Sequence, residues 1–137
     1  MLSVLCLALT IYHEARSEPL LGQKLVAQVV LNRVHSSRYP DTVCEVVKER
    51  KQFSFVTHKG YAPIPSEKRA WQVAYDLAYN ALDTHKPSRV MYYHKTSISV
   101  KWAANLQKHL VVGDHVFYTD RKITRPITRP DTIKENN

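Results

Sequence analysis

The segment from Leu9 to Gln23, LTIYHEARSEPLLGQ, constrains the fold more than any other part of the chain. Apolar residues before and within it recur at three- and four-residue steps, the spacing of one helical face. Pro19 disfavours helical geometry at Glu18 and suits the first turn of a new helix. We therefore predict a core helix that ends near Ser17 and Glu18, and a second helix that continues to about Ser36.

Two further helices are predicted beyond this pair. VCEVVKER follows Asp41 and Thr42, either of which can cap the free amide groups at a helix start. A long amphipathic pattern then runs from Ser66 to Leu82. The intervening stretch, KQFSFVTHKGYAPIP, contains glycine and prolines without a helical period, so we expect an irregular loop with one short extended piece at FSFV.

The C-terminal half contains two candidate strands, RVMYYH and DHVFYTD, which are β-branched and aromatic and alternate approximately. We expect them to pair as a small antiparallel unit, with a loop or short helix around Trp102 to Leu110 between them. The repeat ITRPITRP then interrupts any strand or helix. The predicted architecture is a single, mostly helical α+β domain over residues 1–119, followed by a basic, proline-containing tail over residues 120–137.

Charge and cysteine content narrow the partners without identifying one. The net charge of +8 implies attraction to an acidic partner such as nucleic acid, anionic lipid or a cell-wall polymer. Cys6 and Cys44 lie far apart within apolar helical patterns, so we interpret them as buried thiols rather than as a disulfide. The apolar opening segment has no basic start or cleavage site typical of a signal peptide, and it is too short to span a bilayer.

Motifs for metal or cofactor chemistry are missing from the sequence. Ser17 stands where the helical metalloprotease motif would place a second histidine after His13. No spacing typical of zinc ligands, glycine-rich phosphate loop or nucleophile elbow is present. We therefore predict a protein with no metal site and no cofactor.

Glu14 is the strongest candidate for chemistry. It shares a helix with Leu7 and Ile11, so its carboxyl group should emerge beside an apolar wall. Burial on one side disfavours the charged form of a carboxyl group, which suits a general acid near neutral pH. The alternative is that Glu14 and Glu18 only form surface ion pairs with neighbouring basic groups.

Aromatic and amide side chains in the non-helical segments form a second candidate group, because aromatic faces with hydrogen-bonding tips suit sugar rings. They suit core packing or stacked bases equally well. These residues are Gln52, Phe53, Ser54, Tyr92, Tyr93, His94, Trp102, His115, Phe117 and Tyr118.

The order of motifs resembles the SleB-type cell wall hydrolase family, which includes spore-cortex-lytic enzymes and phage lysins. The resemblance covers roughly Leu7 to Tyr118 and rests on IYHEARSEPLLGQKLVAQVVLNRV, YPDTVCEVV, QFSF, MYYH, a tryptophan at position 102 and GDHVFY. The chain departs from the family at Ser17, where glycine is usual, and at Val100 and Lys101, where a proline commonly precedes the tryptophan.

The resemblance implies a lysozyme-like site that cleaves peptidoglycan glycan strands between N-acetylmuramic acid and N-acetylglucosamine, by lytic transglycosylation. It places the catalytic acid on Glu14. The residues expected to bind substrate or shape the site are Tyr12, Arg16, Glu18, Gln52, Phe53, Ser54, Tyr93, His94, Trp102, His115 and Tyr118.

The expected partner is therefore the peptidoglycan strand, acted on by a monomer with no nucleic acid and no membrane span. Two alternatives stay open: an N-acetylmuramoyl-L-alanine amidase, and a non-catalytic basic module that binds wall or nucleic acid. For location, we expect synthesis in the cytoplasm of a bacterial host and action on the wall, as a phage lysin or a virion-associated protein.

Overall fold

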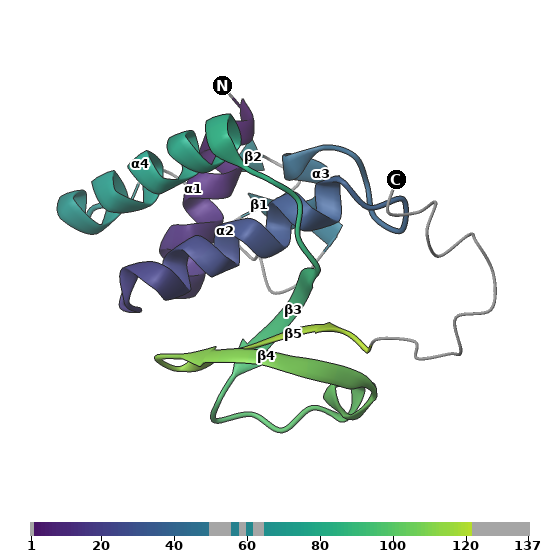
Figure 1. The fold of residues 1–137 in the computed structure, drawn as a ribbon. Helices are drawn as coiled ribbons and strands as arrows, with labels where there is room; N and C mark the ends of the chain where they lie inside the picture. Colours follow the sequence, from purple (N-terminus) through teal and green to yellow (C-terminus); the bar gives the residue numbers. More distant parts are fainter. Residues whose placement is uncertain (1, 50–55, 58–59, 62–64, 122–137) are drawn as a thin grey trace.

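The computed structural model describes residues 2–49, 56–57, 60–61 and 65–121 (Figure 1). Within these ranges the chain forms helices on one side and a small sheet on the other, which confirms the predicted α+β class. The elements in chain order are α1 (Leu2–Ala15), α2 (Leu20–Val34), α3 (Val43–Glu49), β1 (Val56–Thr57), β2 (Gly60–Tyr61), α4 (Lys68–Thr84), β3 (Val90–Lys95), the 3₁₀ helix η1 (Lys101–Asn105), β4 (Leu106–Val112) and β5 (His115–Asp120).

Helix α1 is the centre of the helical part. It contacts α2, α3 and α4, and the seven consecutive residues from Cys6 to Tyr12 are all buried. A helix that is apolar on all sides is stable only when other elements surround it. The predicted core helix is therefore confirmed, and its last turn is held in a fixed place relative to the rest of the molecule.

The predicted break between the first two helices is also confirmed. Helix α1 ends at Ala15, and α2 begins immediately after Pro19, whose backbone is extended at φ −58° and ψ 156°. The Glu18 N–H donates to the carbonyl of Ala15 at 2.9 Å, which closes the turn. The break places the end of α1 beside the start of α2, where the polar residues of the opening segment gather.

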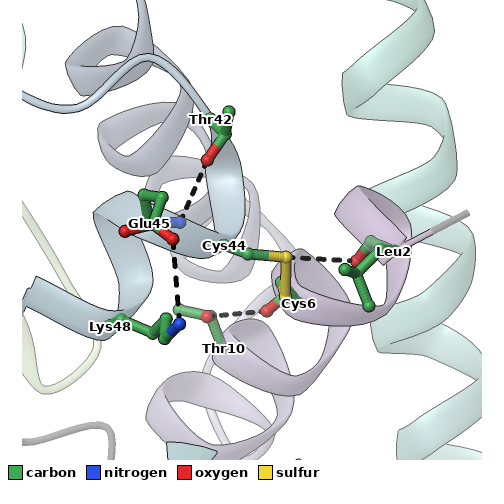
Figure 2. Close-up of a disulfide and its surroundings, with 7 residues drawn as sticks. All are labelled: Leu2, Cys6, Thr10, Thr42, Cys44, Glu45 and Lys48. Carbon is green, nitrogen blue, oxygen red and sulfur yellow. Dashed lines mark hydrogen bonds and ion pairs between the residues drawn. A yellow bond between two sulfur atoms is a disulfide. The ribbon is translucent and has the colours of Figure 1, made fainter.

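The interpretation of the two cysteines as separate thiols is wrong. Helix α3 packs on α1, with the Cα atoms of Cys6 and Cys44 5.4 Å apart, and the two residues form a disulfide (Figure 2). The Thr42 hydroxyl accepts a hydrogen bond from the Glu45 N–H at 3.2 Å and so caps α3, as expected. The sequence separation of 38 residues carried no information about this packing.

The sheet has the strand order β3-β5-β4, and both pairings are antiparallel. The predicted pairing of RVMYYH with DHVFYTD corresponds to β3 and β5 and is confirmed. Strand β4 was not predicted, because the segment was expected to be a loop or short helix. In the segment between the two predicted strands, only the part before β4, the 3₁₀ helix η1, is helical.

Two polar residues of α2 attach the sheet to the helices. The Asn32 side chain donates to the carbonyl of Val90 at 2.8 Å and accepts from the N–H of Ser88 at 2.8 Å. The Arg33 guanidinium donates to the carbonyl of Met91 at 2.9 Å. These bonds fix the start of β3 on α2, so the end of β3 reaches the α1–α2 break.

An apolar cluster completes the attachment between the helices and the sheet. It is formed by Ala15, Leu25, Val26, Val29, Val90, Tyr93 and Phe117.

Within the described ranges, no helix combines the length and apolar character needed to cross a membrane. Of the extended piece expected at FSFV, Phe53 to Phe55 lie outside the described residues, and Val56–Thr57 pairs with Gly60–Tyr61.

Candidate active site

Glu14 lies in the last turn of α1, where the helix meets the sheet. Its Oε1 accepts a hydrogen bond from the hydroxyl of Tyr93 on β3 at 2.8 Å. Tyr93 is buried and Glu14 is partly exposed, so a fixed phenol holds a carboxylate that solvent can still reach. The two residues are 79 positions apart in the sequence, and the fold brings them together.

Glu14 lines a groove of about 510 Å³. One wall is the end of α1 and the turn after it, and the other is formed by the chain that follows β3 and by the β4–β5 turn. The lining residues are His13, Glu14, Ala15, Arg16, Ser17, Glu18, Lys95, Thr96, Ser97, Asp114 and His115. Hydroxyl, ammonium and carboxylate groups therefore surround Glu14, which suits a polar, hydroxyl-rich substrate.

Arg16 and Tyr12 converge on a residue that the sequence did not predict for the site. The Arg16 Nε lies 3.0 Å from Oε2 of Glu67, and the Tyr12 hydroxyl donates to the same oxygen at 2.9 Å. The guanidinium also lies over the Tyr12 ring, 4.6 Å from its centroid. Glu67 comes directly before α4, so these contacts tie the end of α1 to the start of α4 beside the groove.

Glu18 holds the β4–β5 turn against the helix break. Its side chain is only 7% exposed, and Oε1 accepts a hydrogen bond from the Asp114 N–H at 2.8 Å. The turn requires Gly113, which has φ +54° and whose missing Cβ would collide with the Glu18 carboxylate and lie 2.9 Å from Cδ of Pro19. Glu18 is thus engaged in structure and is not free to act on a substrate.

His115 supports the groove from beneath. Its ring packs edge-on against Tyr93 at 5.3 Å, and its Nδ1 lies 3.6 Å from Oε1 of Glu18. Burial lowers the pKa of His115, although the nearby carboxylates of Glu18 and Glu14 oppose that shift. The ring is therefore mainly neutral near neutral pH and acts as a packed wall behind Tyr93.

Three predicted site residues lie away from Glu14. Successive side chains alternate between the faces of a strand, so His94 points away from the face that carries Tyr93. His94 Nε2 lies 2.9 Å from the hydroxyl of Tyr118, and Trp102 packs edge-on against both rings. Trp102 is 43% exposed. The structure brings His94, Trp102 and Tyr118 together as a cluster on the opposite face of the sheet.

Gln52, Phe53 and Ser54, which were also predicted for the site, lie outside the described residues. Glu67 and the polar segment Lys95 to Ser97 were not predicted for the site. Glu67 contacts Arg16 beside the groove, and Lys95 to Ser97 line it, because of how α4 and β3 pack in the fold. Among the described residues, no group of three or more His, Cys, Asp or Glu side chains could hold a metal ion.

The central helix of the helical part carries the Glu14 carboxylate in its last turn, and this carboxylate faces a small antiparallel sheet across a polar groove. This arrangement defines a lysozyme-like α+β class of protein. The sequence model of the family described as Cell Wall Hydrolase matches residues 17–118. The chain belongs to this cell wall hydrolase family. The match begins at Ser17, so the family assignment does not by itself include Glu14.

Solved structures and relatives agree with this assignment. The chain is similar to the catalytic domain of the germination-specific lytic transglycosylase SleB from Bacillus anthracis, with a TM-score of 0.69, 29% identity, and coverage of 85% of this chain and 93% of that domain. It is 31% identical over 113 residues to a spore cortex-lytic enzyme of Bacillus cereus, which covers 81% of this chain and 42% of the relative. A spore cortex-lytic enzyme of Bacillus subtilis is 29% identical, with 81% and 35% covered. The chain thus spans about two fifths or less of these relatives.

Proposed function

We propose that this chain is a peptidoglycan-degrading enzyme that cleaves the glycan bond between N-acetylmuramic acid and N-acetylglucosamine by lytic transglycosylation, with Glu14 as its general acid and base. Membership of the cell wall hydrolase family supports the substrate class. The similarity to a domain described as a lytic transglycosylase supports the reaction type. The observation that carries the assignment of Glu14 is the hydrogen bond from Tyr93, which holds that carboxylate in the groove.

In the proposed reaction, the Glu14 carboxyl group gives its proton to the glycosidic oxygen as the bond to the muramic acid C1 breaks. The resulting carboxylate then accepts the proton of the muramic acid 6-hydroxyl, whose oxygen attacks C1 and forms a 1,6-anhydro ring. One carboxyl group acts in both steps, and the attack benefits from proximity because it is intramolecular. Lys95, Thr96 and Ser97 would bind the sugar hydroxyls along the groove wall.

The state of the other carboxylates supports transglycosylation over hydrolysis. A hydrolase generally needs a second carboxylate across the bond, as base or nucleophile. Among the described residues that line the groove, the other carboxylates are Glu18 and Asp114. Glu18 is nearly buried and accepts a hydrogen bond from the β4–β5 turn, while Asp114 is exposed and belongs to that turn.

For location, we propose that the chain is made in the cytoplasm of a bacterial host and acts as a monomer on the cell wall, as a phage lysin or a virion-associated protein. The disulfide between Cys6 and Cys44 supports action outside the reducing cytoplasm, since such bonds persist in oxidising surroundings. The net charge of +8 supports attraction to the anionic wall.

The proposed reaction can be tested by digesting purified peptidoglycan in heavy-oxygen water and weighing the released fragments. We expect glycans one water lighter than hydrolysis products, with no label at the new end. Labelled reducing ends would show a hydrolase, and released stem peptides would show an amidase.

Glu14→Gln keeps the shape of the side chain but cannot donate the proton, so we expect a loss of about two to four orders of magnitude in rate with an unchanged circular dichroism spectrum.

A further inference from the structure

A second cavity, of about 560 Å³, adjoins the groove and shares Arg16 with it. It lies where the end of α1, the start of α2 and the start of α4 meet. We call it the basic pocket; its lining residues are Arg16, Leu20, Gln23, Glu67, Lys68, Arg69, Ala70 and Val73. None of the reaction steps described above uses it.

The charges in the basic pocket are unusual for the start of a helix. Lys68 and Arg69 occupy the first turn of α4, which contains no acidic residue, although the helix dipole disfavours cations there. Both side chains are exposed, and neither forms an ion pair with an acidic side chain in the part of the chain that the structure describes. Glu67, the residue before α4, also lines the pocket, and its carboxylate is paired with Arg16 at 3.0 Å. Lys68 and Arg69 therefore leave the pocket with a net positive charge that attracts an anion.

The amide and apolar groups of the basic pocket add a second property. Gln23 is only 5% exposed; its Nε2 donates to the carbonyl of Glu18 at 3.0 Å, and its Oε1 has no partner among the described residues. This oxygen is itself covered, and a peptide N–H that reached it would supply the hydrogen bond that it lacks. Leu20 is 56% exposed beside it and, with Val73, offers apolar surface to small side chains.

We propose that the basic pocket binds the carboxylate-bearing peptide stem of the peptidoglycan strand. This inference rests on the proposed function, because the stem is attached to the muramic acid whose bond lies at Glu14. The stem combines free carboxylates, peptide N–H groups and methyl side chains, which match the cations, the amide oxygen and the apolar wall of the pocket. Since both cavities share Arg16, a stem can enter the basic pocket while its sugar occupies the groove.

The kinetic test combines a variant with a modified substrate. In Lys68→Gln/Arg69→Gln, we expect the substrate concentration at half-maximal rate to rise about fivefold and the maximal rate to stay unchanged, because exposed ion pairs contribute modestly. The wild-type chain should bind peptidoglycan whose carboxylates have been converted to amides about as weakly as the variant binds native peptidoglycan. On the amidated material, the variant and the wild type should behave nearly alike. The matched control is Lys86→Gln, an exposed lysine beyond the other end of α4, which should behave as the wild type.

Two results would overturn the proposal. One is a double variant that loses as much on amidated as on native peptidoglycan, which would indicate general attraction by charge. The other is equal or faster cleavage of strands whose stems have been removed, because those strands retain only the lactyl carboxylate.

A binding measurement separates this proposal from the proposed function. Titration with a free tripeptide of L-alanine, D-glutamate and diaminopimelate should shift the backbone resonances of Gln23, Arg69 and Ala70, and the double variant should abolish those shifts. Binding without cleavage of any strand would contradict only the proposed reaction. Cleavage without these shifts would contradict only the peptide site.

Discussion

At the scale of single residues, the contact between Tyr93 and Glu14 matters most for the proposed chemistry. The sequence indicated both residues as candidates, Glu14 from its place at a helix break and Tyr93 from its place in an aromatic strand. It did not indicate that they touch, because the hydrogen bond depends on the attachment of β3 to α2 by Asn32 and Arg33. Side-chain type and spacing were readable, whereas the long-range pairing was not.

We predict that Tyr93→Phe lowers the maximal rate about tenfold, a fraction of what acid–base catalysis typically contributes. The ring keeps its packing against Phe117 and His115, so the melting temperature should change little. The rate is measured as the loss of turbidity of a wall suspension. The control is Tyr92→Phe, which removes the neighbouring hydroxyl that donates to Asp120. Equal losses in the two variants would contradict a special role for Tyr93.

At the scale of elements, the helices were predictable and one strand was not. The helices alternate buried and exposed positions or, like α1, consist of continuous apolar residues. Strand β4 reads LQKHLVV, and all its residues are exposed or half-buried. It has no buried face to produce an alternating pattern, and it exists because its backbone pairs with β5 at the edge of the sheet.

Like strand β4, the disulfide that joins α1 to α3 was not predicted from the sequence. We expect Cys6→Ala/Cys44→Ala to lower the free energy of unfolding by about 3–4 kcal/mol, because the cross-link restricts the unfolded chain. Urea unfolding of the wild type, with and without a reductant, measures the same effect without a mutation. Glu14 lies on α1, so activity should fall with stability as temperature rises. An unchanged urea midpoint under reducing conditions, with free thiols verified by mass, would contradict this expectation.

At the scale of the whole molecule, the sequence predicted the α+β class and the position of Glu14 at the edge of the helical part. It could not show that the sheet divides the aromatic candidates between two faces. Tyr93 and His115 face the helices, while His94 and Trp102 pack on the other side. Composition and alternation give the face of each residue within a strand, but only the packing of the strand says which face meets Glu14.

The stability of the whole molecule should depend on pH through its histidines. Burial lowers the pKa of His13, His85 and His115. The Arg16 guanidinium reinforces the shift in the pKa of His13, while the Glu14 carboxylate opposes it. Below the ordinary histidine pKa of about 6.5, the unfolded chain binds protons that the folded chain does not. The stabilisation is therefore complete above that pH and is lost progressively as the pH falls below about 6.5 and through the lowered pKa values of the folded chain.

We expect the free energy of unfolding, measured by urea at a series of pH values, to fall over this window and to fall less steeply in His115→Gln. His115 is the most informative of the three, because it is buried and faces Glu18, Glu14, Lys95 and Asp114. His109→Gln, which replaces an exposed residue of β4, provides the reference for removing a histidine. If stability instead rises on acidification, the imidazole of His115 gains more from the Glu18 carboxylate, 3.6 Å away, than it loses by burial.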